Sequence, residues 1–282
     1  MTYKCEYTNG KEGIDMRLGF IGLGNMAKAM IGGILKKEVV PATDIMGCAK
    51  SDASKEYASQ NWGILIGEDN IQVARFAEIL VLAVKPQVLP QVIEQIKDAV
   101  SEDTVIVSIV AGVSMDSLSR MFGRSLKFVR CMPNTPALVG MGCTGVCCNE
   151  LVTKDEIEQS LSLLQSFGLA EEVPEKLMDA VVGVSGSSPA YVFLFLEALA
   201  DGAVQAGMPR AQAYRFAAQS IMGSAALALE TGKHPGELKD MVCSPGGTTI
   251  DAVQVLEDRG FRSSVMHAVA ECVSKSRKLD KN

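Results

Sequence analysis

The sequence predicts an α/β fold in two parts, a doubly wound parallel sheet followed by an all-α domain. From Arg17 to about Val173, short β-branched runs alternate with helical patterns, which is typical of βαβ units. Strands such as ILVLAV are almost wholly apolar, as expected for a sheet covered on both faces. After Pro174 the β-branched runs disappear and Ala-rich helical patterns continue. We therefore expect a flexible tail over 1–16, a sheet domain over 17–173 and a helical domain over 174–282.

The strands and helices of the first domain follow one another in chain order. RLGFI predicts the first strand and NMAKAMIGGILKK the first helix, and DIMGCA and SKEYASQN predict the next pair. Further strands are predicted for ILI, AEILVLAV, TVIVSIV and LKFVRC, the later ones separated by helix-like segments. This order fits a parallel sheet with helices on both faces.

The second domain contains two long helices with readable starts. Ser187-Ser188-Pro189 supplies a cap and an early proline for AYVFLFLEALADGAVQAG, and Met208-Pro209 opens the next helix. Both helices are apolar almost all round, so they must be covered on every side. A domain of this size cannot easily surround them alone. We expect a homodimer as the minimum unit, and a higher homo-oligomer is compatible with the same pattern.

Composition excludes several classes of partner. The net charge of -6 and the lack of a basic run argue against nucleic acid. The first residues, MTYKCEYTNGKEGID, have no apolar core of a secretory signal. The most apolar long stretch, from Ala190 to Gly207, is interrupted by Glu197 and Asp201, so no membrane span is expected. These features together predict a cytoplasmic protein.

The eight cysteines do not form a regular disulfide framework, and we interpret them as reduced thiols. Cys143, Cys147 and Cys148 lie close together, but their spacing is not one that zinc sites use, and the chain has only His234 and His267. No metal site is predicted.

A glycine-rich turn lies between the first strand and the first helix. Gly22-Leu23-Gly24-Asn25-Met26-Ala27 is a GxGxxA variant of the dinucleotide fingerprint. Gly22 would allow the tight turn, Gly24 the approach of a pyrophosphate, and Ala27 close packing of helix on strand. The helix N-terminus would hold the phosphates. An ordinary glycine turn is the alternative, but the strand before and the helix after favour a Rossmann-like cofactor site.

The end of the second strand predicts which cofactor is used. NAD enzymes usually place Asp or Glu there against the ribose hydroxyls. This chain has Cys48-Ala49-Lys50-Ser51 instead, and a lysine and a serine suit a 2′-phosphate. We expect NADP(H) to be preferred, with NAD(H) as a second cofactor because Asp52 follows; the alternative is that Lys50 is a solvated loop residue.

Two further strand ends should face the cofactor, because ligands of open α/β sheets lie beyond the carboxyl ends of the strands. These are Ala83-Val84-Lys85-Pro86 and Ala111-Gly112, where Lys85 is more simply a surface residue than a catalytic one. The expected cofactor-binding residues are Ile21, Gly22, Leu23, Gly24, Asn25, Met26, Ala49, Lys50, Ser51, Asn70, Ala83, Val84, Lys85, Pro86, Ala111 and Gly112.

A third glycine-rich segment precedes the helical run IDAVQVLED. Ser244-Pro245-Gly246-Gly247-Thr248-Thr249 would present backbone N–H groups at a helix N-terminus, which suits a carboxylate. The alternative is an ordinary turn capped by Thr248 or Thr249.

Several motifs of this chain resemble those of pyrroline-5-carboxylate reductases. They are GFIGLGNMAKAMIGG, LAVKPQ, RCMPNTPALVGMG, VSGSSPAYVFLFLEALADGAVQAGMPRAQA and HPGELKDMVCSPGGTTIDAVQVLEDRGFRSSV, and the similarity runs from about Arg17 to Lys278. The resemblance implies NAD(P)H-dependent reduction of L-1-pyrroline-5-carboxylate to L-proline, the last step of proline biosynthesis. It also implies interlocked helical domains of two subunits with the active site at their junction.

The resemblance also implies roles for individual residues. Thr249 would hydrogen-bond the nitrogen of the cyclic imino acid and is the candidate catalytic residue. Ser244, Gly246, Gly247 and Thr248 would complete the substrate site, and Glu175, shortly before SGSSPAY, would lie near the bound amino acid. Hydride would pass from the reduced nicotinamide to C5 of the imine. A protonated iminium is already electrophilic, which fits the lack of a His/Asp pair in the sequence.

Two other functions share features with this sequence. A β-hydroxyacid dehydrogenase has a similar GFIGLGNM motif, but it uses a lysine on a helix of its second domain, and SSPAYVFLFLEALADG has none. A non-enzymatic NAD(P)H-binding sensor would keep the glycine fingerprint without needing an anion cradle.

Overall fold

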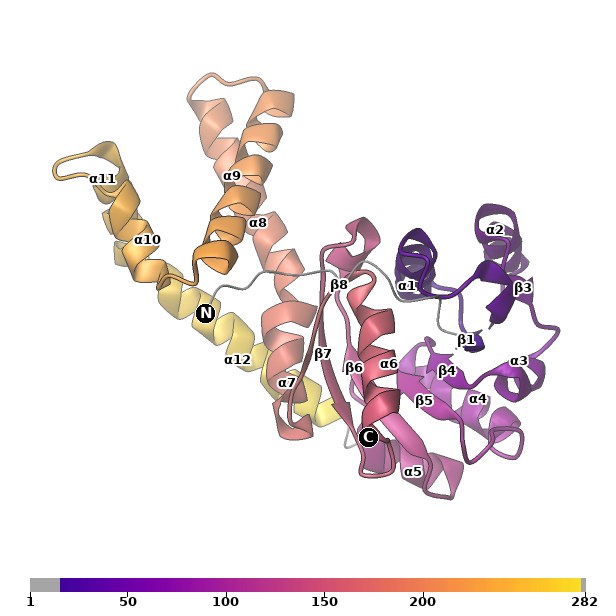
Figure 1. Cartoon of the computed structure of the whole chain (residues 1–282). Helices are drawn as coiled ribbons and strands as arrows, with labels where there is room; N and C mark the ends of the chain where they lie inside the picture. Colours follow the sequence, from indigo (N-terminus) through magenta and orange to yellow (C-terminus); the bar gives the residue numbers. More distant parts are fainter. Residues whose placement is uncertain (1–15, 280–282) are drawn as a thin grey trace. The chain divides into compact units, whose positions relative to one another are not determined.

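The computed structural model describes residues 16–279, so the tail expected over 1–16 falls almost entirely outside the described residues. The described chain forms two compact units (Figure 1). We call residues 16–187 with 271–279 the nucleotide unit, and residues 188–270 the helical unit. The units divide after Ser187, later than the boundary predicted after Val173, because the short helices between these two positions pack on strand β7.

The nucleotide unit is built on one eight-stranded sheet of order β3-β2-β1-β4-β5-β6-β7-β8. Its strands are β1 Leu18–Ile21, β2 Ile45–Cys48, β3 Leu65–Ile66, β4 Ile79–Leu82, β5 Val105–Ser108, β6 Lys127–Met132, β7 Gly142–Cys148 and β8 Gly168–Glu172. All neighbouring strands are parallel except β6 and β7. Strand β1 pairs with both β2 and β4, so the strand order reverses beside it. A ligand crevice is expected at such a switch point.

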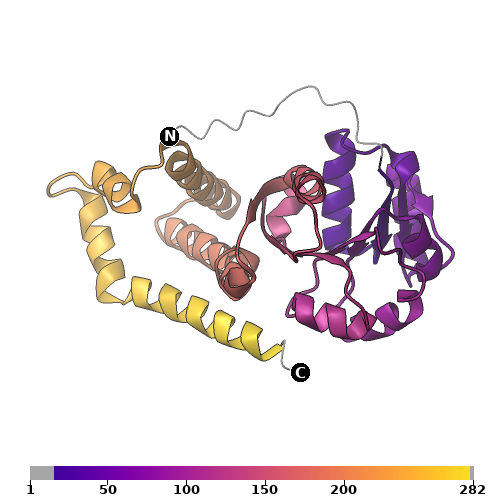
Figure 2. The same cartoon turned by 60° about the horizontal axis from the view of Figure 1, so that its bottom comes forward.

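Helices cover both faces of this sheet (Figure 2). They are α1 Asn25–Lys36, α2 Asp52–Trp62, α3 Asn70–Phe76, α4 Leu89–Ile96, α5 Met115–Phe122 and α6 Lys154–Gln165. Alternate strand residues point to opposite faces, so Leu18 and Phe20 pack with α1 and α6, while Ile21 packs with α3, α4 and α5. Strands buried on both faces explain the continuous apolar runs in the sequence.

A run of short helical pieces follows the sheet. These are a 3₁₀ turn over Glu175–Leu177, helix α7 over Met178–Val181 and a π-helix over Val182–Gly186. Helix α8, Ser188–Gln205, follows the π-helix after the single residue Ser187. The helix start predicted at Ser187-Ser188-Pro189 is confirmed at Ser188, although the proline is the second residue of α8 and not the first, and a π-helix that the sequence did not predict ends just before it.

The last part of α12, Phe261–Leu279, belongs to the nucleotide unit. The Ser276 hydroxyl donates to Asp179 Oδ1 at 2.6 Å, and Arg277 Nε lies 3.6 Å from Asp179 Oδ2. Leu279 packs on Gly112 so closely that a Cβ on that glycine would lie 2.7 Å from the Leu279 Cβ. Residues 271–279 are thus part of the packing of this unit.

The helical unit contains α8, α9 Arg210–Thr231, α10 Pro235–Val242, α11 Thr248–Asp258 and the first part of α12. Helices α8 and α9 pack against each other as a hairpin (Figure 1). Large apolar side chains on both remain open to solvent in the single chain, including Phe193 at 62% exposure and Phe216 at 60%. Within residues 16–279, these two apolar helices are therefore left partly uncovered, as the sequence predicts.

Among the described residues, one helical stretch, residues 175–205, is long and apolar enough to cross a membrane, with a mean hydropathy of 1.3. Core helices of globular proteins pass the same test, so this finding is weak evidence for a span.

Candidate functional site

The glycine turn after β1 has two glycines with different environments. Gly22 has φ +99°, and its N–H donates to the Cys48 carbonyl at 2.8 Å. A Cβ at Gly22 would lie 2.5 Å from the Ala83 carbonyl oxygen, so only glycine fits there. Gly24 caps α1 in an extended conformation, and no atom lies within 4 Å of where its Cβ would be. Gly22 therefore shapes the turn, and Gly24 leaves space beside it.

The first turn of α1 is open to an anion. Its cap residue offers no side-chain hydrogen bond, and no acidic residue lies in the first turn. The N–H groups at a helix start need acceptors and carry the positive end of the helix dipole. The open space beside Gly24 would let a phosphate reach these N–H groups, so the residues present fit a dinucleotide.

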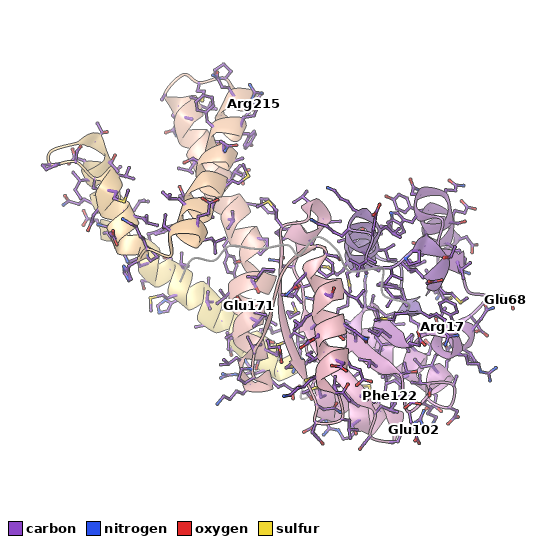
Figure 3. All side chains as sticks on the ribbon, viewed as in Figure 1. Arg17, Glu68, Glu102, Phe122, Glu171 and Arg215 are labelled. Carbon is purple, nitrogen blue, oxygen red and sulfur yellow. The ribbon has the colours of Figure 1, made fainter. Side chains whose placement is uncertain are left out.

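A cavity of about 590 Å³ lies next to this turn, toward β2 and α4. Its lining residues are Ile21, Gly22, Cys48, Ala49, Lys50, Lys55, Glu68, Asp69, Asn70, Ile71, Val84, Val88, Gln91, Val92 and Gln95. Glu68 is labelled in Figure 3 and marks this side of the unit. Apolar side chains share its walls with charged and amide side chains, and its volume is within the range of small-molecule sites.

Six of the expected cofactor residues line this cavity: Ile21, Gly22, Ala49, Lys50, Asn70 and Val84. The Asn70 amide donates to Gln95 Oε1 at 2.8 Å, which fixes its orientation in the wall. Others lie nearby without lining it. Asn25 and Met26 form the first turn of α1, Ser51 caps α2, and Ala83, Lys85 and Pro86 follow β4.

Leu23 and the Ala111-Gly112 pair have different surroundings. The Leu23 side chain is 2% exposed and packs against Gly47, so only its backbone can face a ligand. Ala111 and Gly112 line a separate small crevice at the carboxyl end of β5, together with Met132 and Val182.

Lys55 lines the cavity and was missed by the sequence analysis. Its ammonium lies 3.8 Å from the Asp52 carboxylate, and its side chain is 28% exposed. Helix α2 places Lys55 one turn after its first residue, on the same side as Lys50 at the end of β2. The predicted helix, SKEYASQN, starts two residues late at Ser54; the i, i+3 spacing from the observed first residue, Asp52, could have found Lys55. The Ser51 hydroxyl makes no capping bond, so it can serve a ligand.

Glu175 is held by two protein donors. Its Oε1 accepts from Arg130 Nη1 at 3.0 Å and from the Met115 backbone N–H, at the start of α5, at 2.9 Å. The Arg130 side chain is 10% exposed. The ion pair joins β6 to the 3₁₀ turn at Glu175, and the Met115 bond joins this turn to the start of α5, all within the nucleotide unit. A contact between Glu175 and a bound amino acid stays a prediction.

The cysteines of β6 and β7 are neutral thiols in this environment. Burial raises the pKa of the Cys147 thiol to about 12, and the nearby Glu175 carboxylate adds to the rise while Arg130 opposes it. Burial likewise raises the pKa of the Cys131 and Cys143 thiols. The seven described cysteines are free, and no group of three His, Cys, Asp or Glu within residues 16–279 could hold a metal ion.

The candidate substrate segment lies in the helical unit. Ser244 begins a turn in which its carbonyl accepts from the Gly247 N–H at 3.0 Å, and Gly246 has φ +68°. Gly247, not a threonine, is the N-cap of α11, and it offers no side-chain bond. The capped turn with Thr248 or Thr249 as cap is therefore wrong, because both threonines are already helical. The first-turn N–H groups are presented to solvent beside the Thr249 side chain, which suits a carboxylate.

The fold and the glycine-capped first helix define a dinucleotide-binding α/β protein. Residues 17–112 match the family model described as NADP oxidoreductase, coenzyme F420-dependent. Residues 175–279 match the model described as pyrroline-5-carboxylate reductase dimerisation.

Curated relatives and solved structures agree with these matches. The pyrroline-5-carboxylate reductase of Escherichia coli is 49% identical over 95% of this chain and 100% of its own. That of Synechocystis is 42% identical over the same shares. The solved enzyme of Coxiella burnetii has a TM-score of 0.89 at 34% identity, covering 95% of this chain and 99% of its own. That of Plasmodium falciparum, solved with NADP bound, has a TM-score of 0.87 at 32% identity, covering 95% and 100%. The chain belongs to the pyrroline-5-carboxylate reductase family.

Proposed function

We propose that this protein reduces L-1-pyrroline-5-carboxylate to L-proline with hydride from NADPH, and that NADH serves as a second cofactor. Membership of the family over nearly the whole chain carries this proposal. The helical unit lies within the match to the dimerisation model, and its exposed apolar helices support a homodimer as the minimum unit. We further propose that the enzyme acts in the cytoplasm and completes proline biosynthesis.

The nucleotide unit would hold the cofactor in two places. The N–H groups at the start of α1 would bind the pyrophosphate, with Gly24 leaving room for it. Lys50, Lys55 and the Ser51 hydroxyl would bind the 2′-phosphate at the end of β2. The cofactor supplies the hydride when bound, so the role of the protein is to bind the cofactor and the substrate and to orient them toward each other.

The start of α11 would hold the substrate. Backbone N–H groups after Gly247 would bind the carboxylate, and Ser244, Gly246 and Thr248 would shape the turn around it. The Thr249 hydroxyl would hydrogen-bond the ring nitrogen and orient the imine carbon toward the incoming hydride. A positioning hydroxyl suffices because a protonated imine is already electrophilic.

The activity is tested at 340 nm in three parallel assays: NADPH oxidation with pyrroline-5-carboxylate, NADPH oxidation with tartronate semialdehyde, and NADP reduction with 3-hydroxyisobutyrate. We expect turnover of the imine alone. Turnover of the hydroxyacid pair would indicate a β-hydroxyacid dehydrogenase, and NADPH binding without turnover would indicate a sensor. Complementation of a proline auxotroph gives an independent test in cells.

The role of Thr249 is tested by Thr249→Ala, with Thr249→Ser as the matched control. Losing one transition-state hydrogen bond should lower kcat by about tenfold to a hundredfold, while the Kd for NADPH stays unchanged. Thr249→Ser keeps the hydroxyl and should retain most of the rate. A Thr249→Ala enzyme with full kcat would remove Thr249 from the mechanism.

A further inference from the structure

The Asn134 side chain connects two sequence motifs to which the proposed function assigns no role. Asn134 lies in RCMPNTPALVGMG, and Ser185 lies in VSGSSPAY. The Asn134 side-chain amide donates from Nδ2 to the Ser185 carbonyl at 3.0 Å. Its Oδ1 accepts from the Cys143 N–H at the start of β7, at 2.8 Å. Asn134 is 8% exposed, so both bonds are shielded from water.

The sequence explains why the Ser185 carbonyl needs a partner. In an α-helix this carbonyl would accept from the N–H four residues later, but that residue is Pro189, which has none. The proline ring also crowds the carbonyl four residues before it. Here the helical path widens into a π-helix, with the Ser187 N–H bonded to the Val182 carbonyl at 2.8 Å. The Asn134 amide therefore bonds to a carbonyl that has lost its α-helical donor.

The π-helix lies beside the strand ends that are expected to face the cofactor. Parallel strands β1, β4, β5 and β6 end at one edge of the sheet. Val182 of the π-helix lines the same small crevice as Ala111 and Gly112 after β5. Gly186 is in close contact with Met132 at the end of β6, since a Cβ there would lie 2.8 Å from the Met132 Cε. The 590 Å³ cavity on the β2 side contains none of these residues.

We propose that Asn134 is a positioning residue for the reduction: its amide fixes the π-helix over 182–186 against the Ala111-Gly112 loop and so sets the shape of the nicotinamide end of the site. This inference rests on the proposed function. Because the adenine end of the cofactor would lie in the cavity beside β2, loss of the Asn134 bond affects kcat and leaves the Kd for NADPH unchanged. π-helical segments often occur at functional sites for this kind of local adjustment.

The test uses Asn134→Asp in the full-length enzyme. One oxygen of the new carboxylate still accepts from the Cys143 N–H. Its other oxygen faces the Ser185 carbonyl oxygen, so two acceptors meet and the hydrogen bond to Ser185 is lost. At pH 8 we expect kcat to fall by about tenfold or more, in line with the cost of small misplacements in an active site. Burial beside a carbonyl raises the pKa of the introduced carboxyl, so acidification to pH 6 restores the donor and part of kcat, relative to the unmodified enzyme.

A matched control is available at the opposite edge of the sheet. The Asn149 amide donates to the Leu126 carbonyl at 2.7 Å, and its Oδ1 accepts from the Phe128 N–H at 3.1 Å, near the amino end of β6. Asn149→Asp makes the same chemical change far from the cofactor edge, so it should lower the melting temperature and leave kcat unchanged. Asn134→Ala removes both Asn134 bonds without adding a charge, and it should lower kcat with no recovery at pH 6.

The outcomes separate this inference from the proposed function. If the unmodified enzyme does not reduce pyrroline-5-carboxylate, the proposed function fails. If it does, and Asn134→Asp keeps full kcat at pH 8, or Asn134→Asp and Asn149→Asp lower kcat equally, the positioning role is overturned. If Asn134→Asp does not fold, Asn134→Ala is compared with Asn149→Asp. A lower kcat with an unchanged Kd for NADPH in Asn134→Ala alone supports the positioning role, and an equal kcat in the two variants overturns it.

Discussion

Replacing each of the two fingerprint glycines by alanine should separate folding from cofactor binding. At Gly22 the backbone has φ +99°, and a Cβ would meet the Ala83 carbonyl oxygen at 2.5 Å and its carbon at 2.8 Å. At Gly24 the backbone is extended, with φ -77°, and the space for a Cβ is empty. Gly22→Ala is thus a structural change, and Gly24→Ala fills the space that we assign to phosphate.

The magnitudes follow from these environments. Forcing a left-handed conformation on alanine costs about 1–3 kcal/mol, and moving the backbone of β4 to relieve the contact costs about 1–3 kcal/mol more. A total near 3 kcal/mol lowers the melting temperature of a domain this size by about 6–12 °C. For Gly24→Ala, the poorer helix cap destabilises the folded protein by about 0.5–1 kcal/mol. The lower entropy of the unfolded chain stabilises the folded protein by a similar amount, so the two effects nearly cancel.

The assay combines thermal unfolding with NADPH titration on the same samples. Gly24→Ala should leave the melting temperature within about 3 °C and weaken NADPH binding by at least about tenfold, which is roughly 1.4 kcal/mol. Gly22→Ala should show the large loss of stability. A Gly24→Ala protein with unchanged NADPH affinity would refute the assignment of the α1 start as the phosphate site. An unshifted melting temperature for Gly22→Ala would refute the steric argument.

Three further changes test other parts of the structure. Lys50→Gln with Lys55→Gln should weaken NADPH binding by about tenfold and leave NADH binding unchanged, because only NADPH carries the 2′-phosphate; equal losses for both cofactors in fluorescence titrations would contradict this. The free energy of unfolding, measured with urea, should fall as pH rises from about 9 toward about 12. The reason is that the Cys147 thiol ionises near its ordinary pKa in the unfolded chain, but stays neutral in the folded protein up to its raised pKa. Cys147→Ala should reduce this pH dependence. The side chains of Phe193 and Leu194 on α8 are each more than 60% exposed in the single chain. If α8 forms the dimer contact, the double change Phe193→Glu with Leu194→Glu should give monomers in light scattering, because it buries unpaired charges in the interface. An unchanged dimer would exclude α8 from the dimer contact.

Much of the nucleotide unit can be predicted from local sequence patterns. The apolar strands, the glycine turn and the helix after it follow from periodicity and from the conformational needs of Gly22, which act over a few residues. The uncovered apolar faces of α8 and α9 follow in the same way from helices without a polar side.

Other features depend on partners far away in the sequence. Glu175 bonds to Arg130, 45 residues away, and no periodicity predicts that pairing. The π-helix over 182–186, just before the confirmed start of α8, was not predicted, because the bond that satisfies its Ser185 carbonyl comes from the distant Asn134. The N-cap at Gly247 was missed because threonine is the more frequent cap.

The placement of residues 271–279 affects the order in which the enzyme is completed during synthesis. These residues leave the ribosome after the entire helical unit, yet Ser276 and Leu279 pack in the nucleotide unit against Asp179 and Gly112. A nascent chain can therefore form the sheet early, but it cannot finish that unit until translation has passed Leu279. A premature stop codon within α12 would expose Gly112 and the Asp179 carboxylate even though every strand of the sheet is present.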